Sequence, residues 1–234
     1  MNALLLLLLD SRAPAGAHHH SGGMEAAVST GLVSADPVRG LAGLEDFCQA
    51  RLRTSARVSA AFAAAACRLF AAERTGLPAL VSELDAEYEA RTPSEATRRA
   101  SRELGGGLLR LVRSVLPEAD LVTPWRLCAG AAPHHPLVLG AGVSLAGGGP
   151  ELAARAAALA ACAGPASAAV RLLGLDPFAV QAMLARLAPG VDECARGAAR
   201  YAGRPPAALP ADGAPALDLL ADFHLTAEVR LFAS

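Results

Sequence analysis

Apolar residues recur along most of the chain at spacings of three and four, which place side chains on one face of an α-helix. The clearest stripe follows the helix-start pair Asp36-Pro37 and consists of Val38, Leu41, Leu44, Phe47 and Cys48. Further helices are predicted over residues 24–30, 56–73, 150–162, 164–173, 177–188, 189–201 and 216–228, and from residues 78, 95, 123 and 136. Alternating runs bounded by hairpin turns, which would indicate strands, are absent. The pattern predicts an all-α fold, a single-domain bundle of about ten helices over residues 1–234.

Two of these helices carry features that make specific predictions. The segment from Thr92 to Glu95 has the order of a capping box, which stabilises a helix start by about 1 kcal/mol. The helix that follows, to about residue 116, contains three consecutive glycines at 105–107 that would cost about 3 kcal/mol relative to alanine. Close packing of another backbone is therefore expected there. On the helix from residue 78, a face expected to be solvated carries Glu83, Asp85, Glu87 and Glu89.

The C-terminal part divides into a connector, a helix and a tail. Residues 203–215 form a proline-rich connector, either a linker or a loop held against the bundle. After the helix predicted to 228, residues 229–234 form a short tail.

Composition narrows the function classes. The chain has 234 residues, 53% of them hydrophobic, and a net charge of −1, so nothing favours nucleic acid or an acidic membrane surface. All basic residues are arginine, which indicates either codon bias or a use for bidentate contacts with carboxylate or phosphate. The mean hydropathy of +0.35 suggests that a partner covers some apolar surface.

Neither a membrane span nor a disulfide framework is indicated. The longest uncharged stretch, residues 127–150, contains Pro133, His134, His135 and Pro136 and is interpreted as two buried segments around a loop. The apolar start lacks a basic region before it and ends at Asp10, unlike a signal sequence. The five cysteines contain no CxxC pair, and Cys67 and Cys162 are expected to be buried thiols. A reducing, cytoplasmic location fits these features.

The segment from residue 10 to residue 25 concentrates polar chemistry in one loop. It holds Asp10, three histidines at 18–20, Ser21 and Glu25. A metal site would need ligands from a second segment, which His134 and His135 supply only if the fold brings the loops together. Ser21 is expected to cap the helix that enters at Gly22, with Glu25 near the positive end of its dipole. No P-loop is possible, because the chain has no lysine.

Three motifs, taken together, resemble the urease accessory protein UreF family. The run L-L-L-D-S-x-x-P-x-G-x-x-x-H-S-x-G-x-E over residues 7–25 resembles its N-terminal signature. The segment S-R-E-L-G-G-G-L-L over residues 101–109 resembles its central helix. The ending, His224 with R-L-F-x-S over residues 230–234, resembles its C-terminal tail. The motifs fall in order across almost the whole chain.

The resemblance implies a non-enzymatic, all-α chaperone that dimerises and joins UreD (also called UreH) and the GTPase UreG to deliver nickel into apo-urease. It implies no stably bound cofactor and no metal ligands in this chain, with GTP bound by the partner. The family's tail is ordered by UreD, so Arg230 is the expected main contact. The partner-binding residues expected on this basis are Asp10, His20, Ser21, Glu25, Arg99, Arg102, His224, Arg230, Leu231 and Phe232. Arg99 and Arg102 are expected to contact either the GTPase or an internal carboxylate.

Two other classes remain as alternatives. The first is a small metal-dependent hydrolase that uses the loop at residues 18–20 with His134 or His135. The second is a helical membrane protein, which would partition into detergent.

Overall fold

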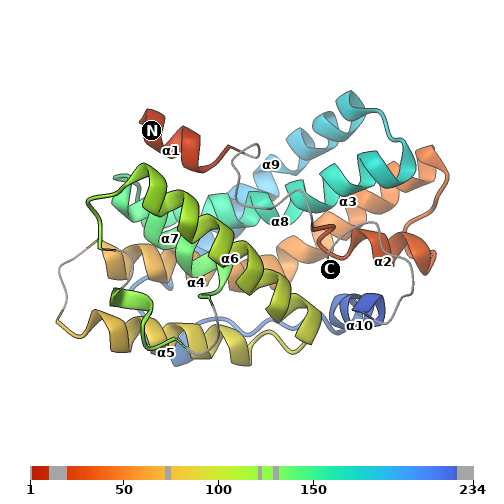
Figure 1. Ribbon diagram of the computed structural model, residues 1–234. Coiled ribbons are helices and arrows are strands. Elements are labelled where there is room, and N and C mark those ends of the chain that lie inside the picture. Colours follow the sequence, from red (N-terminus) through yellow and green to blue (C-terminus); the bar gives the residue numbers. More distant parts are fainter. Residues whose placement is uncertain (1, 11–19, 72–74, 121–122, 129–131, 226–234) are drawn as a thin grey trace.

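The computed structural model describes residues 2–10, 20–71, 75–120, 123–128 and 132–225. Over these residues the chain forms ten α-helices, two short 3-10 helices and no strand, which confirms the all-α prediction (Figure 1). The helices are α1 Ala3–Leu8, α2 Met24–Ser29, α3 Pro37–Arg53, α4 Ser55–Phe70, α5 Leu77–Ala90, α6 Glu95–Val115, η2 Thr123–Trp125, α7 His135–Leu145, α8 Pro150–Leu173, α9 Pro177–Ala199, η3 Pro206–Ala208 and α10 Pro215–Leu225.

Helix α4 lies at the centre of the bundle, packed against α7, α8 and α9. Every residue from 60 to 67 on it is buried, and five of the six between Ala61 and Ala66 are alanine. Small side chains let neighbouring helices approach closely, and α7 crosses α4 at Gly140. A Cβ at Gly140 would lie only 2.2 Å from the Ala63 carbonyl oxygen, so the two backbones touch directly.

The Asp-Pro pairs start helices as predicted. Asp36 Oδ1 accepts a hydrogen bond of 2.9 Å from the Arg39 amide at the start of α3. Asp176 accepts from the amides of Phe178 and Ala179 at the start of α9. Both carboxylates satisfy amides that have no partner inside the helix.

The predicted helix end near residue 188 is wrong, and the continuation predicted from residue 164 joins its helix without a break, since α8 and α9 each run unbroken through a proline. Pro165 has no N–H, which leaves the Ala161 carbonyl one turn earlier without its usual donor. The Nε of Arg51 fills that position with a hydrogen bond of 2.9 Å. Pro189 lies on the exposed side of α9, as does Ala185 one turn earlier, so water can reach the carbonyl that it frees.

The start of α6 also differs from the prediction. Ser94 is the N-cap, accepting from the Thr97 amide at 3.1 Å, while the Thr92 hydroxyl donates to the Tyr88 carbonyl at the end of α5. The glycine prediction is confirmed at Gly105. A Cβ there would lie 2.0 Å from the Pro133 carbonyl oxygen, so α6 and the segment before α7 pack backbone to backbone.

The uncharged stretch and the connector pack against the bundle. Residues 136–143 of α7 are buried, while the helix expected from residue 123 is only the short η2. One helix in the described part of the chain, α8, is long and apolar enough to cross a membrane. It packs on α3, α4, α7 and α9 as a core helix does. The connector is held to the bundle by Arg91, which donates to the Ala207 carbonyl at 3.0 Å.

Replacing Gly140 with alanine should destabilise the fold, because the new methyl group would overlap the α4 backbone. We expect the free energy of unfolding to fall by about 3 kcal/mol. The control is Gly197→Ala on α9, where nothing lies within 4 Å of the added Cβ. That change should be neutral or stabilise by about 0.5–1 kcal/mol. Urea denaturation of both variants measures the difference, and equal stabilities would contradict the close α4–α7 crossing.

Candidate functional site

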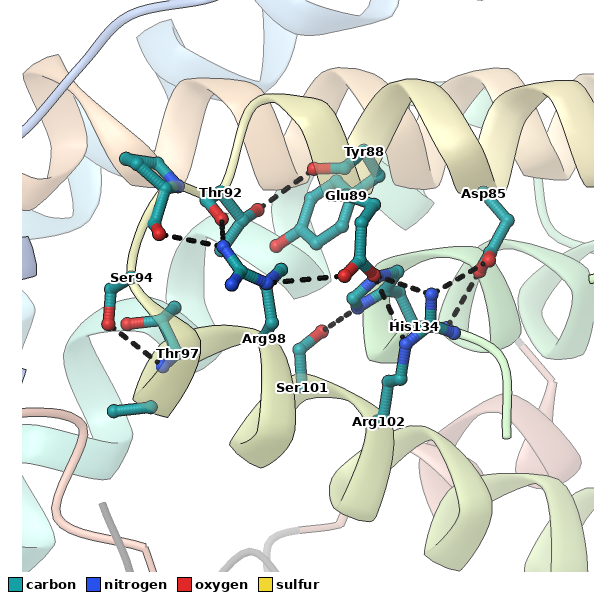
Figure 2. A network of polar contacts seen from close by, with 12 residues as sticks. Asp85, Tyr88, Glu89, Thr92, Ser94, Thr97, Arg98, Ser101, Arg102 and His134 are labelled. Atoms are coloured by element: carbon teal, nitrogen blue, oxygen red, sulfur yellow. Dashed lines mark hydrogen bonds and ion pairs between the residues drawn. The ribbon is translucent and has the colours of Figure 1, made fainter. Parts of the chain in front are cut away.

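A buried carboxylate on α5 organises a polar network between α5, α6 and the segment that precedes α7 (Figure 2). Asp85 is 0% exposed, so the prediction of a solvated acidic face is wrong at this residue. Its Oδ2 lies 3.1 Å from Nη2 of Arg102 on α6, and its Oδ1 accepts from the His134 amide at 3.2 Å. Arg102 also donates to the Ala132 carbonyl at 2.7 Å. A buried charge needs such partners, because burial removes its hydration.

Glu89, one turn further along α5, continues the network. Its Oε2 lies 2.5 Å from Arg102 Nη2 and 2.7 Å from Nε2 of His134, and its Oε1 lies 3.2 Å from Nε of Arg98. Partial burial acts to raise the pKa of Glu89, but the hydrogen bonds from His134 and Arg102 outweigh it and lower the pKa below its usual value. The carboxylate is therefore ionised at neutral pH and can only accept hydrogen bonds.

His134 joins the two helices through both ring nitrogens. It is fully buried, with Nδ1 3.1 Å from the Ser101 hydroxyl and the ring 4.8 Å from that of Tyr88. Burial lowers the pKa of His134, and the charge of Arg102 adds to this effect. The ring is thus neutral, and because Glu89 can only accept, Nε2 carries the proton and Ser101 donates to Nδ1.

The three connected residues Ser101, His134 and Glu89 are of the types that serve as nucleophile, base and acid in a catalytic triad. In a triad the acid stabilises the imidazolium that forms during catalysis. Here Arg98 and Arg102 both pair with Glu89, and the pKa of His134 is lowered by burial, so the ring is a poor base. The geometry therefore supports a structural role, which is to fix α6 and the start of α7 against α5.

A cavity of about 270 Å³ adjoins this network. Alanines of α8 line one part of its wall, and the polar residues on it include His20, Arg51, Tyr88, Ser101, His135 and Asp218. Helix α10 contributes to the wall through Leu217, Asp218 and Ala221. The cavity thus lies where the N-terminal loop, the polar network and the C-terminal helix meet.

The end of the N-terminal loop is anchored to α8 by Arg51. Besides the Ala161 carbonyl, Arg51 donates through Nη1 to the Gly22 carbonyl at 2.9 Å. Gly22 has a φ of +60°, and a Cβ there would lie 3.0 Å from Pro165 Cγ. His20 is thereby brought to the cavity, with its Nε2 3.8 Å from Glu103 Oε2.

Ser21 does not cap α2, contrary to the prediction. The N-cap is Gly23, in a left-handed conformation and without a side-chain hydrogen bond. The Ser21 carbonyl accepts from the Met24 amide, while its buried hydroxyl oxygen finds no hydrogen-bond partner in the described segments. Glu25 does lie in the first turn of α2, as predicted.

The other predicted partner residues are scattered. Asp10 follows α1 and is half-buried, and Arg99 is 70% exposed and pairs with Glu103 at 2.9 Å. Arg102 contacts internal carboxylates, which was one of the two expectations for it. His224 belongs to α10, but its side chain lies outside the described part, as do Arg230, Leu231 and Phe232 altogether.

The metal-site alternative is met only in part. The fold brings His20 and His135 to one cavity, whereas His134 turns into the polar network. Among the described residues, no group of three or more histidine, cysteine or acidic side chains could hold a metal ion. His18 and His19 lie outside the described residues.

Three residues that hold the site together were not predicted from the sequence: Asp85, Arg51 and Asp222. Asp222 accepts a hydrogen bond from the Ala96 amide at the start of α6. A proline inside an apolar helix signals a carbonyl in need of a donor, and this could have pointed to a residue such as Arg51. Nothing local distinguishes Asp85 from its exposed neighbours on α5.

Comparisons with known proteins give one consistent result. A sequence model described as UreF matches residues 38–188. The urease accessory protein UreF of Mycolicibacterium vanbaalenii is 44% identical over 235 residues, covering 99% of this chain and 98% of that protein. The proteins of the same name from Mycobacterium marinum and Mycobacterium tuberculosis are 41% and 39% identical, each over 99% of this chain and 98% of their own length.

Removing Arg102 should be far more damaging than removing its exposed neighbour. Arg102→Ala leaves the buried Asp85 without its cation, which should lower the free energy of unfolding by about 3–5 kcal/mol. Arg99→Ala removes an exposed pair one turn away and should cost no more than about 0.5 kcal/mol. Chemical denaturation of the two variants tests this, and comparable losses would show that Asp85 does not depend on Arg102.

Stability should fall as the pH is lowered through the histidine range. Burial, with a contribution from His20, lowers the pKa of His135 to about 4, whereas an unfolded chain has a histidine pKa of about 6.5. At a pH between these two pKa values, His135 binds a proton in the unfolded state but not in the folded state. His135 alone should therefore reduce the free energy of unfolding by about 2 kcal/mol between pH 7 and pH 5.

The matched measurement is urea denaturation of His135→Asn at the two pH values. The variant should lose about 2 kcal/mol less than the parent chain on acidification. Gln181→Asn, at an exposed position on α9, serves as control and should keep the parent's pH dependence. The same pH dependence in all three proteins would show that folding does not lower the pKa of His135.

Proposed function

The chain belongs to the UreF family of urease accessory proteins, and we propose that it acts as a non-enzymatic scaffold in the assembly that delivers nickel to apo-urease. The observation that carries this proposal is similarity over nearly the whole length to proteins that bear that name. In the proposed assembly, this chain joins UreD (UreH) and the GTPase UreG, and two copies form a homodimer within the complex. We place this assembly in the cytoplasm.

The chemistry of the chain supports a division of labour within the assembly. Without lysine it cannot form a P-loop, so GTP binding and hydrolysis are assigned to the partner GTPase. Nickel is treated as cargo of the whole assembly, with no stable site on this chain. The buried network gives no activated nucleophile, since Glu89 is held by two arginines.

The C-terminal tail is the proposed anchor for UreD. Arg230, Leu231 and Phe232 combine a cation with apolar side chains on a chain end, and aromatic residues and arginine are over-represented among residues that dominate binding energy. His224 lies on the helix that leads into this tail.

A second docking surface is proposed around the end of the N-terminal loop. The proposed contacts are Asp10, at the start of the loop, His20, at its end, and Glu25, in the first turn of α2. Ser21, whose side chain is buried, shapes this surface from inside. Arg99 is assigned to the GTPase because its side chain is 70% exposed. Arg102 is assigned to the internal network instead.

Truncation after Leu225 should abolish urease activation while leaving the fold intact. The test is urease activity in cells that lack their own UreF and carry either the parent chain, the truncated chain or Arg230→Ala. We expect the point variant to weaken capture of UreD at least tenfold. Replacing an anchor residue with alanine costs about 2 kcal/mol or more of binding free energy.

Arg196→Ala, at an exposed position on α9, is the matched control and should activate urease normally. Full activation by the truncated chain would remove the tail from the proposal. Reproducible turnover of a substrate or hydrolysis of GTP by the purified chain alone would instead support the hydrolase alternative.

A further inference from the structure

The N-terminus of α6 is completed by a carboxylate from α10. Asp222 Oδ1 accepts a hydrogen bond of 2.6 Å from the Ser94 hydroxyl and one of 3.0 Å from the Ala96 amide. Ser94 in turn accepts from the Thr97 amide, so two free amides of α6 are satisfied by one local and one distant side chain. A negative charge at this end of a helix is also favoured by the helix dipole.

Helix α10 has two main packing partners. The helix packs mainly on α2 and α6 and lies beside them in Figure 1. Its inner side lines the cavity through Leu217 and Ala221, while Leu219 is 72% exposed. The hydrogen bonds from Ser94 and the Ala96 amide to a carboxylate are charge-assisted and directional, unlike the apolar contacts around them. They define the rotation of α10 relative to α6.

We propose that Ser94 and Asp222 form a latch that holds α10, the helix after which the proposed docking tail follows in the sequence, in the orientation that the accessory partner binds. Asp222 is in this sense a positioning residue for docking. The inference rests on the proposed function, which assigns the docking contact to the tail.

The latch would increase affinity because it increases the fraction of molecules that are ready to bind. If α10 is released, this helix samples many orientations, and the apparent dissociation constant rises by the inverse of the fraction of molecules in which it remains correctly oriented. The latch therefore contributes to affinity without touching the partner.

The variant Ser94→Asp separates the latch from the cap. Aspartate is as good an N-cap as serine, so α6 keeps its local cap, but a second carboxylate now faces Asp222. Repulsion between the two should release α10. The double variant Ser94→Asp with Asp222→Ser restores one hydroxyl and one carboxylate with their places exchanged.

Two measurements on the full-length chain are needed. Hydrogen exchange of the α10 amides should become about tenfold faster in Ser94→Asp, while exchange in α4 and α8 stays unchanged. Capture of co-expressed UreD should weaken about tenfold, the effect of losing about 1.4 kcal/mol. Both should return to within about threefold of the parent chain in the double variant.

The outcomes distinguish the latch from the proposed function. If truncation after Leu225 abolishes capture of UreD but the Ser94→Asp variant captures it normally, the latch is overturned and the proposed function stands. Normal capture by the truncated chain would overturn the tail assignment itself. Equal acceleration of exchange in α4, α8 and α10 would mean that the pair only stabilises the whole fold, and this would overturn the latch as well.

Discussion

Direct contact between backbones at two glycines is the constraint on which this structure depends. At Gly140, α7 lies against the carbonyl of Ala63, and at Gly105, α6 lies against the carbonyl of Pro133. These two contacts set the position of the segment that carries His134. A side chain at either glycine would separate the elements, and the hydrogen bonds that join α5, α6 and the start of α7 could then no longer form at their observed lengths.

Close helix packing leaves polar groups inside the bundle, and arginine is the residue that satisfies them. Arg51 joins two carbonyls from different segments, while Arg98 and Arg102 each pair with Glu89 and also donate to carbonyls. A guanidinium can do this because it offers five donors in a fixed plane, whereas the lysine ammonium is a single point of charge. The use of arginine alone in this chain therefore matches a structural need, whatever its origin in codon usage.

This arrangement fits the proposed scaffold role. Small residues and internal ion pairs hold the core from α4 to α9 together, so its surface side chains can contact other proteins. Exposed apolar side chains such as Val38, Phe178 and Leu219 lie on three different helices. The C-terminal helix α10 packs mainly on α6 of this core and on α2, and in the proposed assembly it leads into the docking tail.

Local pattern was enough to predict the all-α class, the Asp-Pro helix starts, the burial of Cys67 and Cys162 and the close packing at Gly105, because each follows from local periodicity or from a residue's own stereochemistry. Local pattern did not predict that α8 continues through Pro165, that Asp85 is buried or that Asp222 completes the start of α6. The reason is that these outcomes depend on partners distant in sequence: Arg51 supplies the donor near Pro165, Arg102 the cation for Asp85, and α10 the carboxylate for Ser94. Local pattern shows that a group needs a partner, but only the folded chain identifies it.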